Sequence, residues 1–286
     1  MNTFLVFSQT GIFDLFLLVN LVLAGSWYLW AVKRARQTGS WSRWKIFAFL
    51  IGLTLLAFTY LGPIAAWSHT FFWAHMTQHL VVMMAVAPLL VLGAPATLWF
   101  QASSPDTRRR WVIPILRSRA VRLLTNPYLT WLFFAAVLLG VHFTGFYNLA
   151  LENHDIDYFI EQPLYFAAAF LFYFPLIGNN LQPRRPSHSF RIASLALMMI
   201  PEAITGAIIY FAPVMLYPFF DTDRPFGPAA LDDQHFSGAL MWALVMVVDS
   251  GWMMLAAAEW FSSEERIGRR IDREIADELA AERMVP

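Results

Sequence analysis

The chain has 286 residues, of which 58% are hydrophobic and only 14% are charged, and its formal net charge is zero. Soluble domains average about a quarter charged residues, so this composition indicates an integral membrane protein. The chain has no cysteine, which excludes disulfides, thiolate zinc sites and C-x-x-C redox chemistry. Nothing in this composition points to nucleic acid as a partner.

Seven apolar segments follow one another along the chain, each near the length of about 20 residues that crosses a bilayer as a helix. They cover roughly residues 12–32, 45–62, 72–92, 128–147, 159–178, 191–213 and 237–261. The first residues lack the positive n-region of a signal peptide, so we expect the first segment to be retained. The sequence predicts an all-α polytopic membrane protein, with seven transmembrane helices in a single domain over residues 1–261.

Basic residues alternate between the connecting loops. The basic loops contain Lys33, Arg34, Arg36, Arg43 and Lys45, then Arg108, Arg109, Arg110, Arg117, Arg119 and Arg122, and then Arg184, Arg185 and Arg191. Arg266, Arg269, Arg270 and Arg273 follow the last segment, whereas loops 63–71 and 148–158 have no lysine or arginine. The positive-inside rule therefore predicts an N-terminus outside the membrane and a cytoplasmic C-terminus.

Residues 262–286 form a charged segment with one apolar stripe. Its apolar residues recur every four positions, at Ile267, Ile271, Ile275 and Leu279. This spacing predicts an amphipathic helix. We expect this cytoplasmic tail to lie on the membrane surface or on a partner.

Six of the seven histidines fall in the outer loops or the outer turns of the predicted helices, and only His188 falls in a cytoplasmic loop. His75 and His79 are four residues apart, on one face of the third predicted helix. His142 lies at a similar depth on the fourth. A single interfacial histidine usually bonds to a neighbour, which is our expectation for His69, His154 and His235.

Methionines accompany these histidines. Met76 follows His75 directly, and Met83 lies one turn below His79 on the same helix face. Imidazole and thioether ligands without thiolate suit copper, especially Cu(I). The sequence thus predicts a copper site whose candidate ligands are His75, His79, His142, Met76, Met83 and His235.

Two enzyme-like interpretations fail on single residues. The run H-M-T-Q-H at 75–79 resembles the H-E-x-x-H of zinc hydrolases, but Met76 replaces the glutamate that acts as general base. A seven-helix retinal protein needs a lysine in its last helix, and the only lysines here are Lys33 and Lys45. We therefore expect a protein that is not an enzyme.

Glu202 and Asp249 lie near the middle of the sixth and seventh predicted helices, with no lysine or arginine at their depth. Intramembrane acids are costly and are functional candidates by default. They could carry protons or metal ions. Alternatively, each could bond to a tyrosine, a tryptophan or a backbone carbonyl and serve packing alone.

Four stretches resemble the CtaG family of caa3-type cytochrome c oxidase assembly factors. They are HMTQHLVVMMAVAPLLVLGAP at 75–95, VHFTGFYNLAL at 141–151, FAPVMLYP at 211–218 and LDDQHFSGALMW at 231–242. The resemblance implies a seven-helix protein of the bacterial plasma membrane that supplies or stabilises copper for a haem–copper oxidase. It also implies functional roles for His75, Gln78, His79 and His142, with Asp233 and Gln234 as weaker candidates. The family pattern has histidines where this chain has Tyr158 and Gln162.

The leading hypothesis is a copper-handling assembly factor. Its partners would be subunit I of the oxidase, membrane lipid and a periplasmic copper donor. Two alternatives stay open on the sequence. One is a b-type cytochrome or quinol oxidoreductase in which His79 and His142 bind haem from two helices. The other is a permanent accessory subunit of an oxidase.

Overall fold

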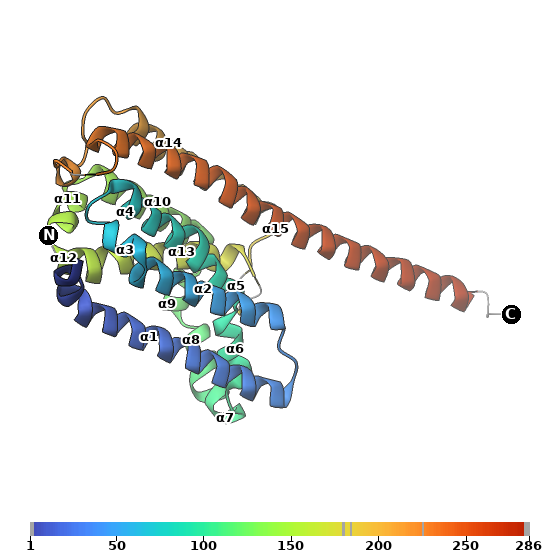
Figure 1. Cartoon of the computed structure of the whole chain (residues 1–286). Coiled ribbons are helices and arrows are strands. Elements are labelled where there is room, and N and C mark those ends of the chain that lie inside the picture. Colours follow the sequence, from blue (N-terminus) through green and yellow to red (C-terminus); the bar gives the residue numbers. More distant parts are fainter. Residues whose placement is uncertain (1–2, 179–180, 184, 225, 283–286) are drawn as a thin grey trace.

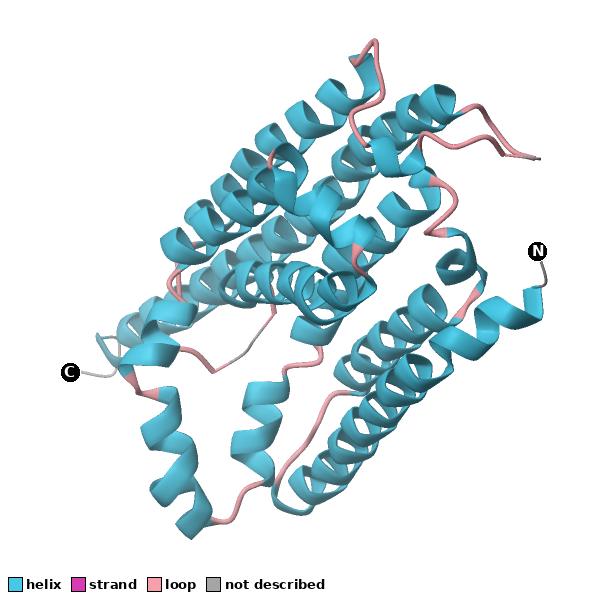
Figure 2. Ribbon diagram, turned by 90° about the vertical axis from the view of Figure 1, so that its left-hand side faces the viewer, coloured by secondary structure: helices cyan, strands magenta, loops and turns pink. Residues whose placement is uncertain are grey.

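The structure is a computed structural model that describes residues 3–178, 181–183, 185–224 and 226–282. Figures 1 and 2 show that the described chain is helical throughout and contains no strand. Its elements are α1 (Thr3–Thr38), α2 (Arg43–Leu61), α3 (Pro63–Trp67), α4 (Phe72–Val81), η1 (Val82–Val86), α5 (Ala87–Leu92), α6 (Pro95–Ala102), α7 (Pro105–Thr107), η2 (Arg108–Val112), α8 (Ile113–Leu116), α9 (Arg119–Leu124), α10 (Pro127–Phe143), α11 (Gly145–Glu152), α12 (His154–Ile156), η3 (Asp157–Glu161), α13 (Gln162–Leu176), α14 (His188–Phe211), η4 (Pro218–Phe220) and α15 (Ala230–Glu282).

Six helices in the described ranges are long and apolar enough to cross a membrane. A seventh span is present if α10 and α11, which are bent by 71° relative to each other, count as one. The bend lies at Thr144, whose hydroxyl accepts a hydrogen bond from the amide of Phe146 and starts the second helix. An all-helical membrane protein with six to seven spans is thus confirmed, whereas the predicted orientation of the termini stays a prediction.

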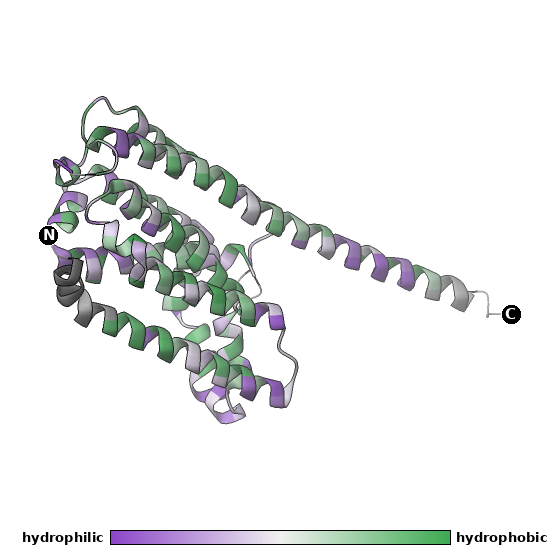
Figure 3. Cartoon of the chain, viewed as in Figure 1, coloured by the Kyte–Doolittle hydropathy of each residue, from purple (hydrophilic) through white to green (hydrophobic). Residues whose placement is uncertain are grey.

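The bundle has two chemically different ends. Figure 1 shows α3, α11 and α12 at one end, which we call the histidine end because His69, His75, His79, His142 and His154 belong to the elements that meet there. The arginine-bearing elements η2, α9 and the start of α14 belong to the opposite end, which we call the arginine end. The helical segments between these ends consist largely of hydrophobic residues, as the hydropathy colouring of Figure 3 shows.

Two hydrophobic clusters fill the bundle. The larger one joins α4, η1, α5, α10, α13, α14 and α15, and the smaller one joins α1, α2, α5 and α6. Tyr28 ties the smaller cluster together because its hydroxyl donates to the carbonyl of Gly93 at 2.7 Å. Both Met76 and Met83 are buried in the larger cluster.

Helices α14 and α15 cross through a pair of glycines. A Cβ placed on Gly238 would lie 2.4 Å from the amide nitrogen of Tyr210 and 2.7 Å from the carbonyl oxygen of Gly206. Small residues at a crossing allow two transmembrane backbones to approach closely. The sequence therefore specifies close packing of these two helices.

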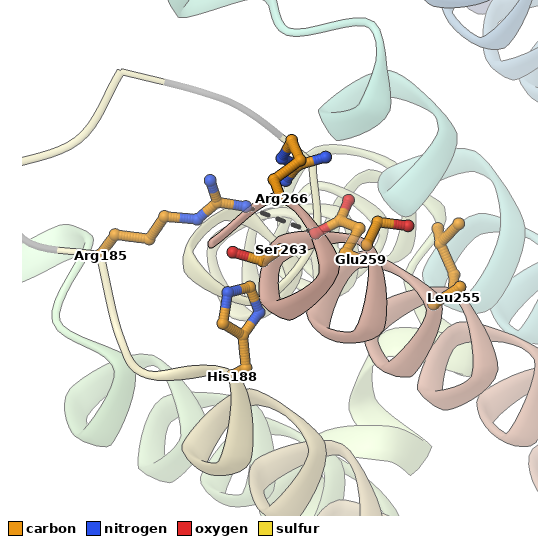
Figure 4. A pocket seen from close by; sticks show the side chains of 8 residues that line it. Arg185, His188, Leu255, Glu259, Ser263 and Arg266 are labelled. Carbon is orange, nitrogen blue, oxygen red and sulfur yellow. Dashed lines mark hydrogen bonds and ion pairs between the residues drawn. The ribbon is translucent and has the colours of Figure 1, made fainter. Parts of the chain in front are cut away.

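Ion pairs join the arginine end of α14 to α15. A pocket of about 380 Å³ lies there. Figure 4 shows Arg185, His188, Glu259 and Arg266 among the side chains that line it. The carboxylate of Glu259 accepts from buried Arg191 at 2.6 Å and from Arg185 at 3.4 Å. His188, the histidine predicted to lie apart from the others, belongs to this cluster.

Helix α15 continues without a break from the last span through the described part of the predicted tail (Figure 1). Ile267, Ile271 and Ile275 are exposed on it, and the side chain of Leu279 lies outside the described residues. The apolar stripe therefore has no partner among the described residues. The division at residue 261, and the location of the tail on a membrane or a partner, stay predictions.

Candidate metal centre

Helix α4, which carries the first two histidines, is fixed to α15 at its first residue. The amides of Phe72 and Trp73 donate to the carboxylate of Asp233 at 2.8 and 3.0 Å. A carboxylate at this place satisfies helix N–H groups that have no intrahelical partner, and it complements the helix dipole. Arg224 donates to the same buried carboxylate at 2.6 Å, so its charge is paired. Asp233 therefore positions α4 and is engaged in this contact.

The imidazole rings of the two histidines of α4 lie in contact with each other. Their Nε2 atoms are 2.7 Å apart, and the side chains of His75 and His79 are only 1% and 4% exposed. One neutral ring can donate to the other in this arrangement, with the other nitrogen accepting. The Nδ1 atom of His79 has no hydrogen-bond partner among the described residues. The pair predicted from the four-residue spacing is thus brought together.

A third candidate ligand, Glu161, is a residue that the sequence analysis did not select. Glu161 ends the π-helical segment η3, its side chain is 0% exposed, and its Oε1 lies 3.9 Å from His79 Nε2. One ligand atom from each of His75, His79 and Glu161 lies within 4.8 Å of the others. Within the described ranges, neither carboxylate oxygen of Glu161 has a hydrogen-bond partner.

Further buried polar atoms without partners surround this trio. His142 uses its Nδ1 to bond the carbonyl of Leu138 at 2.8 Å, which leaves its Nε2 unsatisfied among the described residues. The hydroxyls of Tyr147 and Tyr165 are likewise unsatisfied there. The Tyr165 ring lies 4.3 Å from that of His79 and 6.2 Å from that of His142. His142 is therefore next to the trio, separated from His79 by an aromatic ring.

The trio has the chemistry of a metal site. Each buried polar group without a partner costs about 1–3 kcal/mol, and a charged one costs more. Two atoms bound to one copper or zinc ion at about 2.0–2.1 Å each lie at most about 4.2 Å apart. The His75–His79 and His79–Glu161 separations of 2.7 and 3.9 Å fall within this limit. A bound cation would compensate the carboxylate of Glu161, whose oxygens have no hydrogen-bond partner among the described residues.

The model of the cytochrome c oxidase caa3 assembly factor family (Caa3_CtaG) matches residues 26–263. The chain belongs to this family. The predicted resemblance is thereby confirmed.

Curated relatives extend well beyond this chain. Uncharacterized proteins of Mycobacterium bovis and Mycobacterium tuberculosis are each 26% identical over 253 residues, which cover 86% of this chain and 38% of the relative. An uncharacterized protein of Mycobacterium leprae is 26% identical over 270 residues, which cover 91% of this chain and 41% of the relative. The chain thus spans about two-fifths of the length of these relatives. No solved structure matches it.

Gln78 and Gln234, which the family resemblance selected, and His235, which the copper prediction included, lie outside the trio. Gln78 donates to the carbonyl of Thr59 at 3.1 Å and so ties α4 to α2. Gln234 accepts from the amide of Leu216 at 2.7 Å and donates to the carbonyl of Val214 at 3.1 Å. His235 bonds the carbonyl of Ala212 at 2.9 Å. In this assembly-factor fold, these contacts hold the backbone around the trio.

Glu202 and Asp249 touch each other in the middle of the bundle. Their side chains are hydrogen-bonded, and the hydroxyl of Tyr173 donates to Asp249 at 2.9 Å. Because ionised carboxylates only accept hydrogen bonds, one member of the pair must carry a proton. The second oxygen of Glu202 has no partner within the described ranges. Glu202 and Asp249 thus form a pair of their own, which is separate from the histidine trio.

A second group of ligands lies at the histidine end, outside the trio. One ligand atom from each of His69, His154 and Asp157 lies within 4.8 Å of the others. His69 and His154 are exposed, whereas Asp157 is 3% exposed and accepts from Gln162 at 3.1 Å. Desolvation lowers the pKa of His69, although the Asp157 carboxylate opposes this shift. The neutral, metal-binding form of His69 therefore prevails at neutral pH.

Proposed function

We propose that this protein holds a copper ion between His75, His79 and Glu161 and delivers it to, or stabilises, the catalytic subunit of a caa3-type cytochrome c oxidase. Copper is the cargo in this proposal, and the chain supplies ligands without catalysing a reaction. The partners are subunit I of the oxidase, the surrounding lipid and a copper donor on the periplasmic side. The location is the bacterial plasma membrane.

The buried carboxylate of Glu161 is the observation that carries the proposal. It faces two imidazoles at the end of a transmembrane bundle, and its oxygens have no hydrogen-bond partner among the described residues. A carboxylate in such surroundings is expensive unless a cation or a proton compensates it. Two imidazole nitrogens at its side favour a metal cation over a proton.

The charge pattern favours a periplasmic location for this site. The histidine end lacks the arginine-rich loops, which gather at the opposite end of the bundle. By the positive-inside rule, the arginine end faces the cytoplasm. An ion arriving from the periplasm would then reach the trio without crossing the membrane.

The donor set bears on the choice of metal. Imidazole suits copper, zinc and iron, and a carboxylate makes the set harder than the imidazole–thioether set that favours Cu(I). Met76 and Met83 lie in the hydrophobic core, and the acid–imidazole trio supports the proposal without them. We therefore propose a site that accepts Cu(II) as well as Cu(I).

The two alternatives differ in their support. A haem shared by His79 and His142 requires room for a macrocycle, and the rings of Tyr147 and Tyr165 pack against these histidines. This packing gives the haem hypothesis no support. A permanent accessory subunit is compatible with the same site, and co-purification with mature oxidase at constant stoichiometry would favour it over transient delivery.

Metal analysis of the purified protein tests the proposal. Wild type, His75→Ala/His79→Ala and Glu161→Gln are loaded with Cu(I) or Cu(II), desalted and assayed for bound copper. We expect the double variant to lose one equivalent of copper. We expect Glu161→Gln to bind it at least about tenfold more weakly, since even changes beyond the ligands cost about 10–100-fold. His235→Ala is the matched control, and equal copper in all four proteins would refute the assignment.

A further inference from the structure

The second group of candidate ligands, His69, His154 and Asp157, comes from two separate parts of the chain. His69 comes from the loop between α3 and α4, and His154 and Asp157 come from α12 and the first position of η3. Their ligand atoms nevertheless lie within 4.8 Å of one another. The rings of His69 and His154 have their centroids 5.9 Å apart. Two exposed imidazoles therefore stand over one buried carboxylate.

This outer group and the buried trio share one helical segment. Asp157 is the first residue of η3 and Glu161 is the last, so the two carboxylates belong to the same side of one short π-helical stretch. Residues about one turn apart on a helix are neighbours on its surface. In the same way, His69 precedes the helix that carries His75. Both chain segments that contribute to the outer group are thus continuous with segments that carry residues of the trio.

We propose that His69, His154 and Asp157 form a second metal site, which captures the ion at the surface and passes it to His75, His79 and Glu161. The inference rests on the proposed function in so far as the trio is the destination. The outer site itself binds a divalent or monovalent copper ion through two imidazoles and one carboxylate, whether or not the inner site does.

The difference in burial gives the transfer its direction. An ion in the outer site keeps contact with water through the exposed histidines. Moving inward, it exchanges the Asp157 carboxylate for that of Glu161, whose oxygens have no hydrogen-bond partner among the described residues. The inner site then holds the ion more tightly, because its ligands are desolvated and interact more strongly with charge. The outer site speeds capture without determining the final affinity.

Copper stoichiometry tests the outer site independently of the inner one. The inner variant His75→Ala/His79→Ala is compared with a variant that additionally carries His69→Ala/His154→Ala, and free Cu(II) is the probe. We expect the inner variant to retain one weakly bound equivalent, which the quadruple variant lacks. Electron paramagnetic resonance of that copper should show coupling to imidazole nitrogen. An inner variant that binds no copper would overturn the outer site.

Loading kinetics test the transfer. We expect His69→Ala/His154→Ala to load the inner site at least about tenfold more slowly, yet to the same final occupancy as wild type. Both histidines are exposed, so the variant should fold, and Asp157→Asn, which keeps an acceptor for Gln162, provides a second variant with the same expected delay. His235→Ala should load at the wild-type rate. An unchanged loading rate in both outer variants would overturn the proposed transfer. The copper content of the inner variant tests the inner site, and thus the proposed function, separately.

Discussion

Replacing Gly238 by alanine tests whether the crossing of α14 and α15 depends on the close contact of their backbones. The added Cβ would lie 2.4 Å from the Tyr210 nitrogen, 2.7 Å from the Gly206 oxygen and 2.8 Å from the Tyr210 Cα. Ordinary contacts between carbon atoms have their optimum at about 3.5–4.0 Å. All three neighbours are backbone atoms, which cannot rotate away. The two helices must therefore separate by about 1 Å.

The cost of this separation can be bounded. A gap of about 0.5–1 Å forfeits a quarter to a half of each dispersion contact along the crossing, and overpacking costs typically about 1–3 kcal/mol. Alanine also has a helix propensity about 0.8–1.0 kcal/mol better than glycine, which offsets part of this cost. The matched control is Gly251→Ala, on the same helix, where a Cβ meets no atom within 4 Å among the described neighbours. Because both variants share the propensity gain, their difference isolates the contact.

We expect Gly238→Ala to be less stable than Gly251→Ala by about 1–3 kcal/mol. Reversible unfolding by SDS in mixed micelles, followed by tryptophan fluorescence and circular dichroism, gives the two free energies of unfolding. Equal stability of the two variants would refute the reasoning, because the backbones would then not be in contact at Gly238.

The same assay tests two buried carboxylates. Asp233→Ala leaves Arg224 and the first amides of α4 without their partner, and we expect it to lower the free energy of unfolding by about 3–5 kcal/mol. The control Asp232→Ala removes an exposed neighbour and should lower it by less than about 0.5 kcal/mol. Similar losses in the two variants would contradict the anchoring of α4. Asp249→Asn keeps the partners of Tyr173 and Glu202 and should change stability by less than about 1 kcal/mol, whereas Asp249→Leu should cost about 1–3 kcal/mol. A larger loss for asparagine than for leucine would contradict a hydrogen-bonding role for Asp249, since only asparagine keeps polar partners for Tyr173 and Glu202.

Hydropathy predicts much of this fold because a segment inside the bilayer must satisfy its backbone N–H and C=O groups by hydrogen bonds within itself, which makes it helical. The seven apolar segments correspond to the spans and to the bent pair α10 and α11. The four-residue spacing of His75 and His79 also predicts their contact, because residues at this spacing lie on one face of a helix. Contacts between distant segments are different. Asp233 caps α4 from a position 161 residues further along the chain than Phe72, and no local pattern indicates this contact.

The rule that acids within apolar segments are functional candidates also applies to Glu161. Glu202 and Asp249 are candidates because acids within apolar segments are costly, and Glu161 lies in the apolar segment 159–178 in the same way. Its position near the segment boundary makes it look like an interfacial residue. The exposed histidines His69 and His154 were expected to bond single neighbours, because a loop sequence does not show that Asp157 lies beside them.

The π-helical segment η3 accounts for one departure from the family pattern. The resemblance implies histidines at the positions of Tyr158 and Gln162, four residues apart, whereas the ligands that the structure brings together are Asp157 and Glu161, one residue earlier and also four apart. Because a π turn accommodates an additional residue, it changes which side chains of a helix face the bundle, and such turns often occur at functional sites. Gln162 instead supports Asp157 through a hydrogen bond. Asp157 and Glu161 are thus candidate ligands one residue before the positions that the resemblance selects, and the π-helical turns of η3 lie at this shift in register.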